Sequence, residues 1–330
     1  MTSLALGPDA ACIERDPAAL TGAWSALADQ RSEPSIFLTP EWLSVARAHD
    51  AGTSITLAIG DPVRGIAALA RDPDGAIRFA GGELTDLQDV VAAPGTEAAA
   101  AGALGRWLAR ERPPCVRLSF VFEDSPTLPA VATELTRAGY AVTQRRLVTS
   151  PSLPLPADFE TYVQSLGKKE RHELRRKLRR LETTATASYR TVSDAERPAV
   201  LDRFFELHRL SHGRKADFMT PPVERFFRDV AEALAPLGRL RLGALHVDGT
   251  DVAILFGFAY RQTLALYNAA YDPGLSSLSI GIASHAWAIR DAIAEGMNVY
   301  DLLRGDEPYK YDLGARDRYL AELLADRVPA

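Results

Sequence analysis

Apolar and polar positions along the first half of the chain follow helical and strand periods in a fixed order. Two helices come first, and the second has Thr39 as its N-cap and Pro40 at its first position. Three strands follow, and after a Pro94-Gly95 break the pattern predicts a helix, a strand, a second helix and a last strand. The expected ranges are helices at 17–29 and from 40, strands at 54–60, 64–71 and 76–80, an alanine-rich helix ending near 110, a strand at 116–120, a helix at 126–137 and a strand at 140–148.

The second half repeats this order, and Pro273-Gly274 breaks the chain where Pro94-Gly95 does in the first half. Because antiparallel hairpins are combined with a crossover through a helix, the order indicates a mixed α/β (α+β) fold of two duplicated domains, not a doubly wound one. The expected ranges are a strand near 188–192, helices at 195–212 and 222–235, strands at 239–247, 251–260 and 263–270, a helix at 279–295, and strands at 298–302 and 318–323.

The helix expected at 279–295 has the clearest period. Its apolar residues recur at spacings of four, three and four, which predicts one buried stripe, and Gly296 follows as a C-cap. The stripe consists of Ile282, Ala286, Ile289 and Ile293.

A segment with prolines at 151, 154 and 156 separates the halves and continues into a helix or helix pair. Its run from 168 to 181 puts three leucines on one face and dense positive charge on the rest, the leucines being Leu174, Leu178 and Leu181. The sequence therefore predicts an N-terminal domain at 1–150, a connector with a basic helix at 151–182 and a C-terminal domain at 183–330.

Composition narrows the class of protein without naming a partner. The 330 residues are 47% apolar and 25% charged, which suffices for two domains with cores, and a net charge of −5 gives no bulk attraction to DNA or to a membrane. Cys12 and Cys115 have no spacing typical of a disulfide framework or a zinc site. Without a leader or an apolar run of about 20 residues, we expect a cytoplasmic protein with no membrane span.

A serine-rich turn leads into the helix at 279–295. A helix N-terminus offers unpaired N–H groups and partial positive charge, so a phosphate could bind where Ser277, Ser279 and Gly281 let it approach. The alternative is an ordinary serine-capped helix after a turn.

A second polar cluster follows the strand that ends at Asp301. Arg304, Glu307, Tyr309 and Lys310 fall in one loop just past that strand, where α/β enzymes gather catalytic groups. A charged surface loop with internal salt bridges is the alternative, although such loops rarely carry two tyrosines beside a lysine.

Other chemistries find less support. His208 and His212 lie one helical turn apart but lack a third ligand, so we expect no metal site and place them on a partly buried helix face. Ser119, Ser165 and Ser284 have no nucleophile-elbow context, which argues against a hydrolytic triad.

Several of these segments together resemble the CelD-like branch of GNAT acetyltransferases, which is related to the FemAB peptidyltransferases. The resemblance covers roughly residues 155 to 325, whereas residues 1 to 150 match mainly in element order. It is carried by 159–162, 165–171, the basic helix, 205–208, 252–253, 271–272, 279–281 and above all by Asp301-Leu302-Leu303-Arg304-Gly305-Asp306-Glu307-Pro308-Tyr309-Lys310.

The resemblance implies tandem GNAT-like domains and transfer of an acyl group from acyl-CoA, most simply acetyl-CoA, to a small-molecule or peptide amine. It places the pantetheine arm between the strands at 263–270 and 298–302, and the pyrophosphate at Ser277, Ser279 and Gly281. We expect these two strands to be parallel neighbours that part near their C-terminal ends.

On that mapping, the reacting carbonyl lies among Asp301, Tyr309, Lys310 and Asp272. Asp301 or Asp272 would take the amine proton through water, Lys310 would stabilise the oxyanion, and Tyr309 would protonate the leaving thiolate. The expected substrate-binding residues are Arg304, Glu307, Arg175 and Arg176.

Two departures from the family keep other functions open. The usual glycine-rich CoA signature of GNAT enzymes is only half present, and the basic helix is the one segment that could replace the long two-helix arm of FemAB proteins. An aminoacyl-tRNA-dependent transferase is therefore the second hypothesis, and a non-catalytic binding module is the third.

Overall fold

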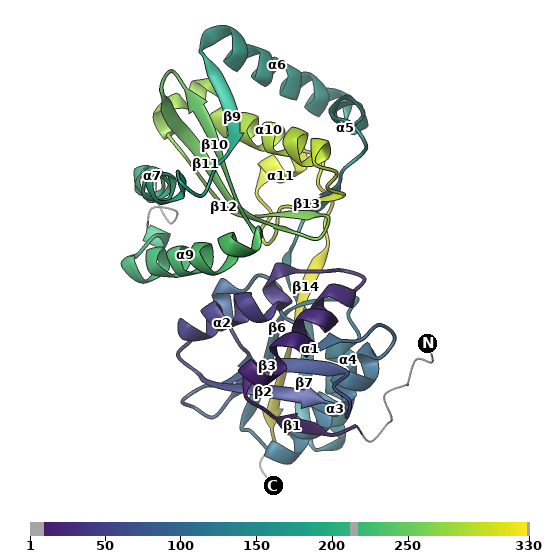
Figure 1. Cartoon of the computed structure of the whole chain (residues 1–330). Coiled ribbons are helices and arrows are strands. Elements are labelled where there is room, and N and C mark those ends of the chain that lie inside the picture. The colour runs from purple at the N-terminus through teal and green to yellow at the C-terminus, as the bar shows by residue number, and fades with distance from the viewer. Residues whose placement is uncertain (1–9, 212–216, 329–330) are drawn as a thin grey trace. The chain divides into compact units, whose positions relative to one another are not determined.

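The computed structural model describes residues 10–211 and 217–328, which divide into two compact units (Figure 1). Unit 1 comprises Met1–Thr149 and Tyr319–Ala330, and unit 2 comprises Ser150–Arg318. The expected boundaries differ in two places. The segment expected as a connector at 151–182 belongs to unit 2, and the end of the chain belongs to unit 1 rather than to the C-terminal domain.

Unit 1 is a mixed sheet covered by helices. Its strands follow the order β1-β2-β3-β4-β6-β14-β7, and β5 pairs with β3. The elements are β1 (Cys12–Glu14), α1 (Pro17–Gln30), α2 (Pro40–Ala48), β2 (Thr53–Ile59), β3 (Gly65–Arg71), β4 (Ile77–Phe79), β5 (Val91–Ala92), α3 (Glu97–Glu111), β6 (Cys115–Phe122), α4 (Thr127–Arg137), β7 (Tyr140–Thr149) and β14 (Tyr319–Arg327).

The last strand of the chain, β14, is a central strand of unit 1. It pairs antiparallel with both β6 and β7, and Leu323 at its middle is fully buried. The expected strand at 318–323 is therefore confirmed, whereas its assignment to the C-terminal domain is wrong. Alternation of apolar residues identifies a strand, but it does not identify the strands beside it, because any sheet with an apolar face satisfies the same period.

Unit 2 is a six-stranded sheet in the order β8-β13-β12-β11-β10-β9, with helices on both faces. Its elements are β8 (Ser152–Pro154), α5 (Phe159–Ser165), α6 (Lys168–Thr184), β9 (Ala187–Thr191), α7 (Arg197–Leu210), α9 (Pro221–Leu234), β10 (Leu240–Val247), β11 (Thr250–Tyr260), β12 (Thr263–Tyr271), the 3₁₀ helix η4 (Pro273–Leu278), α10 (Ile280–Ala294), β13 (Val299–Asp301) and α11 (Pro308–Asp312).

The two faces of this sheet differ in chemistry because side chains alternate along each strand. Phe256 and Tyr267 point to the face of α7 and α9, where they join a cluster of rings that includes Phe227. Leu255 and Leu266 point to the other face and pack in the core beneath α10. Since α10 crosses β9 to β12, the sheet is buried on both sides in that region (Figure 1).

The duplicated order expected from the sequence is confirmed in the strand pairing. In unit 1, β4 runs parallel to β6, and in unit 2, β12 runs parallel to β13. In unit 1, however, the Gln88 N–H donates to the Phe120 carbonyl beyond the end of β4, at 2.9 Å. The chain itself thus bridges the space beyond that strand pair.

Most helices begin and end within a few residues of the positions expected from the sequence. Thr39 caps α2 by accepting the Trp42 N–H through its hydroxyl. The loop expected at 304–312 instead contains the short helix α11. His208 is buried, and its Nε2 lies 2.9 Å from the Asn268 Oδ1, whereas His212 falls outside the described residues.

The central place of β14 gives a stability prediction. Leu323→Ala should lower the free energy of unfolding of unit 1 by about 2–5 kcal/mol, because it leaves a cavity that the surrounding core side chains fill only in part. Urea unfolding with probes in each unit measures this. Leu147→Ala on β7, whose side chain is exposed, is the matched control and should cost less than about 0.5 kcal/mol. An equal, small effect of both changes would contradict the assignment of β14.

Candidate active site

The strands β12 and β13 form a short parallel ladder and then part. They pair at three positions, of which the last joins Ala265 to Asp301, and β13 ends there while β12 continues to Tyr271. The expected parallel neighbours are thus confirmed, but they part after the first three residues of β12 rather than near its C-terminal end. Just past this point Tyr267 is an extra residue in β12, because Phe256 pairs with Asn268 and Gly257 with Leu266. Such bulges bend a strand and are common beside active sites.

A tightly folded loop follows β13. The Asp301 Oδ1 accepts the Leu303 N–H at 2.9 Å, and Leu303, although buried, has a left-handed backbone with φ of 55°. Gly305 has φ of 112°, and a Cβ there would lie 2.5 Å from a Glu307 carboxylate oxygen. A leucine in this region costs of order 1–3 kcal/mol, so the surrounding contacts must hold the loop in place.

Lys310 supplies those contacts. Its Nζ donates to the carbonyls of Leu303, Arg304 and Gly305 at 2.7–3.1 Å, and the Glu307 carboxylate lies 3.0 Å away. The side chain is almost fully buried. An ammonium has three hydrogens, and here each has a carbonyl acceptor. The expected role of Lys310 as an oxyanion donor therefore does not fit this geometry, because all three N–H groups of its ammonium already donate to carbonyls of the loop.

A buried histidine links the loop to α10 and β13. The rings of His285 and Tyr309 are stacked with centroids 4.9 Å apart, and the His285 Nδ1 lies 3.1 Å from the Tyr300 hydroxyl. Burial raises the pKa of Tyr309, with smaller contributions from Glu307 and Tyr271. Tyr309 is therefore held as a neutral phenol, which can donate a hydrogen bond but is a weaker acid than an exposed tyrosine.

Asp272 does not join this group. It is the N-cap of η4, and its Oδ1 accepts the Gly274 N–H at 2.8 Å. It also lies seven positions beyond Ala265, which corresponds to about 20 Å along a strand. Since Ala265 pairs with Asp301, the two carboxylates do not lie at the same point of the gap, and the expected grouping of Asp272 with Asp301 is wrong.

The N-terminus of α10 lies next to the far end of β12. Ser279 precedes the helix with φ of 55°, and its side chain makes no capping hydrogen bond, so the alternative of an ordinary serine cap is wrong. Ser277 is exposed, and Gly281 lies in the first turn, which holds no acidic residue. A Cβ at Gly281 would be 3.8 Å from the Tyr271 ring, an ordinary contact.

A profile of the acetyltransferase (GNAT) domain family matches residues 168–311, which include the parting strands, the N-terminus of α10 and the loop of Lys310. Unit 2 carries a GNAT acetyltransferase domain. No curated protein sequence matches the chain closely enough to add to this assignment.

Solved structures of similar fold span almost the whole chain. FemX has a TM-score of 0.68 at 11% identity, covering 95% of this chain and 96% of FemX. L-PGS from Bacillus licheniformis has a TM-score of 0.57 at 13% identity, covering 95% and 92%. A tandem GNAT protein from the clavulanic acid biosynthesis pathway has a TM-score of 0.51 at 12% identity, covering 98% and 99%. At these identities the likeness concerns the fold, and it confirms the expected tandem fold.

The basic helix α6 packs beside the N-terminus of α10 in the GNAT domain. Leu181 lies in one core cluster with Ile280, and Leu278 of η4 packs against it. The expected leucine face is confirmed, since Leu174 and Leu181 are buried and Leu178 is half-buried. Of the expected substrate-binding arginines on this helix, Arg175 pairs with Glu160 and Arg176 with Glu173.

His285 and Tyr300 were not among the candidates from sequence. Both lie within apolar periods, on α10 and β13, so their positions alone predict core residues. The sequence did offer one signal for them, which is a polar side chain at a position expected to be buried. A buried histidine or tyrosine needs a hydrogen-bond partner, so two such residues can be expected to contact other polar groups.

Two kinds of feature are not found among residues 10–211 and 217–328. No group of histidine, cysteine and acidic side chains there could hold a metal ion. No helix in that part of the chain is long and apolar enough to cross a membrane.

The contacts of Lys310 predict a structural effect. Lys310→Met should lower the free energy of unfolding by about 2–4 kcal/mol, because the carbonyls of three consecutive residues lose a charged donor. Thermal unfolding measures this, with Lys169→Met on the exposed face of α6 as a control expected to change stability by less than about 0.5 kcal/mol. Equal stability of the two variants would show that the ammonium does not hold the loop.

Proposed function

We propose that the protein is an N-acyltransferase that moves an acyl group from acyl-CoA to an amine acceptor by direct attack. The observation that carries the proposal is the gap between β12 and β13, which opens at Ala265 and Asp301 inside the GNAT domain. A gap between parallel strands admits an extended chain such as a pantetheine arm, because the facing backbone groups of β12 are released from the ladder.

The donor phosphates would bind at the N-terminus of α10, near Ser277, Ser279 and Gly281. Unpaired N–H groups and the helix dipole favour an anion there. The corresponding helix of unit 1, α3, carries Glu97 in its first turn, whereas the first turn of α10 has no acidic residue. This contrast supports donor binding in unit 2 rather than in unit 1.

The reaction would take place at the end of the gap where β12 and β13 part, beside Asp301. The acceptor nitrogen attacks the thioester carbonyl, a carboxylate takes its proton through water, and the C–S bond breaks as the thiolate is protonated. We assign the base to Asp301, which ends β13 where the strands part, since Asp272 lies seven positions beyond that point of β12. We assign the acid to Tyr309, which carries its proton in the folded protein. Lys310 acts as a positioning residue, because its ammonium shapes the loop between these two.

The acceptor would be a small-molecule or peptide amine. Arg304 and Glu307 lie in the loop held by Lys310, and both side chains reach solvent. We propose that they contact the acceptor, since they border the loop that carries Tyr309.

A matched pair of variants tests donor binding. Gly281→Glu places a carboxylate in the first turn of α10 and should weaken acyl-CoA binding by at least about tenfold, because an anion then faces an anion. Gly281→Ala is the control, since a Cβ there makes only an ordinary contact with Tyr271, and its affinity should stay within about twofold. Isothermal titration calorimetry with acetyl-CoA measures both, and equal affinity of the two variants would refute the phosphate site.

Aminoacyl transfer from tRNA is the second candidate, and the charge of α6 favours it. Arg179 and Arg180 are exposed on this helix, and no carboxylate in the described part of the chain pairs with either. Two free cations beside the N-terminus of α10 would suit a polyanion. They would equally suit a CoA phosphate, so the choice rests on experiment.

Charge reversal on α6 separates the two donors. If tRNA is the donor, Arg179→Glu with Arg180→Glu should reduce the slope of log Kd against log salt concentration by about two, since two counterion-releasing contacts are lost. Filter binding of tRNA measures the slope. Arg137→Glu, at an exposed position of unit 1, is the control. A tRNA affinity that neither change alters, or that is absent throughout, leaves acyl-CoA as the donor.

A further inference from the structure

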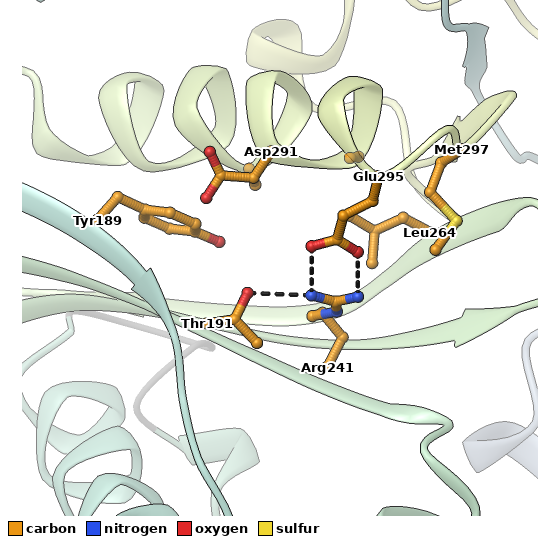
Figure 2. Close-up of a pocket in the computed structure, with 9 residues that line it drawn as sticks. Tyr189, Thr191, Arg241, Leu264, Asp291, Glu295 and Met297 are labelled. Atoms are coloured by element: carbon orange, nitrogen blue, oxygen red, sulfur yellow. Dashed lines mark hydrogen bonds and ion pairs between the residues drawn. The ribbon is translucent and has the colours of Figure 1, made fainter.

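A groove lies between α10 and the sheet of unit 2. Its inner part is walled by Leu255, Leu264 and Leu266 of β11 and β12 and by Ala288 of α10. Its outer part continues past Ala292 to Met297 (Figure 2). The two parts share Tyr189, Arg241, Leu264 and Ala288, so they form one continuous groove.

The inner end of the groove meets the gap between β12 and β13. Ala265 and Tyr300 both line it. Ala265 belongs to the last residue pair before the strands part, and Tyr300 belongs to the pair before that. Leu266, the next residue of β12, lines it as well. A chain that enters the gap therefore reaches the groove without crossing another wall.

Glycines form the floor of the groove. A Cβ at Gly243 would lie 1.8 Å from the Tyr189 hydroxyl, so the ring of Tyr189 occupies its place only because β10 has no side chain there. A Cβ at Gly257 would lie 2.5 Å from the Ala265 carbonyl oxygen. Both glycines lie on the face covered by α10, and a side chain at either position would clash with Tyr189 or with the backbone of β12.

The outer end of the groove is polar. Arg241 pairs with both carboxylate oxygens of Glu295 and donates to the Thr191 hydroxyl (Figure 2). The Tyr189 hydroxyl points along the groove, and within the described residues it has no hydrogen-bond partner. Burial raises the pKa of Tyr189, so it remains a neutral donor there.

We propose that this groove binds the acyl chain of the donor and that the preferred donor is an acyl-CoA with a chain longer than acetyl. The proposal rests on the proposed acyl-CoA function and adds the class of acyl group. Aliphatic walls favour a hydrocarbon chain, since burial of each methylene stabilises the complex by a similar amount. The Tyr189 hydroxyl would meet an oxygen or nitrogen carried near the end of that chain.

The sheet geometry sets the length of the groove, which is narrow: its two parts each have a volume of about 10 Å³, so a bound chain must push apart the side chains that line it. Neighbouring strands lie about 4.8 Å apart, so the distance from β12 to β10 is about 10 Å, the length of an extended chain of about eight carbons. Each buried methylene tightens binding by a factor of up to about four. Octanoyl-CoA should therefore bind at least about tenfold more tightly than acetyl-CoA, even after the cost of ordering the chain.

Binding of an acyl-CoA series tests this without a known acceptor. Isothermal titration calorimetry with acetyl-, butyryl-, hexanoyl- and octanoyl-CoA should give a Kd that falls with chain length in the wild-type protein. Ala288→Leu fills the inner groove from α10 and should abolish that dependence while acetyl-CoA binds within about twofold of wild type. Ala292→Leu, in the outer groove, is the matched control and should leave butyryl-CoA binding unchanged.

The outcomes separate this inference from the function on which it rests. A wild-type Kd that is independent of chain length, or a dependence that Ala288→Leu retains, would overturn the groove and leave donor binding intact. No binding of any acyl-CoA would overturn both. If Ala288→Leu does not fold by circular dichroism, Tyr189→Ala provides the test, since it enlarges the groove and should move the tightest binding to a longer chain. An unchanged preference would refute the groove.

Discussion

The parallel pairing of β12 with β13 over only three residue pairs is the constraint on which the rest of unit 2 depends. Because β13 stops at Asp301 while β12 continues, one edge of β12 is left open in the middle of a sheet that is covered on both faces. Everything proposed for the site lies along that edge. The N-terminus of α10 stands at its far end, the loop after β13 stands beside it, and the groove beneath α10 begins where the two strands part.

The loop after β13 shows how this opening is kept in shape. A buried leucine with a left-handed backbone is unfavourable, and it persists because Asp301 holds its N–H and Lys310 holds its carbonyl. The same loop leads into α11, where Tyr309 stacks on His285. Lys310 thus connects the end of a strand to the position of a phenol, which is the basis of the positioning role proposed for it.

The order of elements could be predicted from sequence, whereas the contacts within the candidate site could not. Periodicity predicted the strand that became β14 but not its partners in unit 1, because register depends on residues far apart in the chain. The loop at 301–310 was recognisable from its polar residues, yet the direction in which Lys310 points depends on backbone carbonyls, which leave no mark in the sequence. His285 could not be recognised as a site residue from sequence, because it lies among the apolar residues of a helix and its position therefore predicts only a core residue.

Native mass spectrometry of the purified chain, titrated with acyl-CoA and with aminoacylated tRNA, shows which donor the protein binds. We expect one acyl-CoA per chain, held through unit 2 and lost in Gly281→Glu but not in Gly281→Ala. Binding of aminoacylated tRNA with no binding of any acyl-CoA would contradict it.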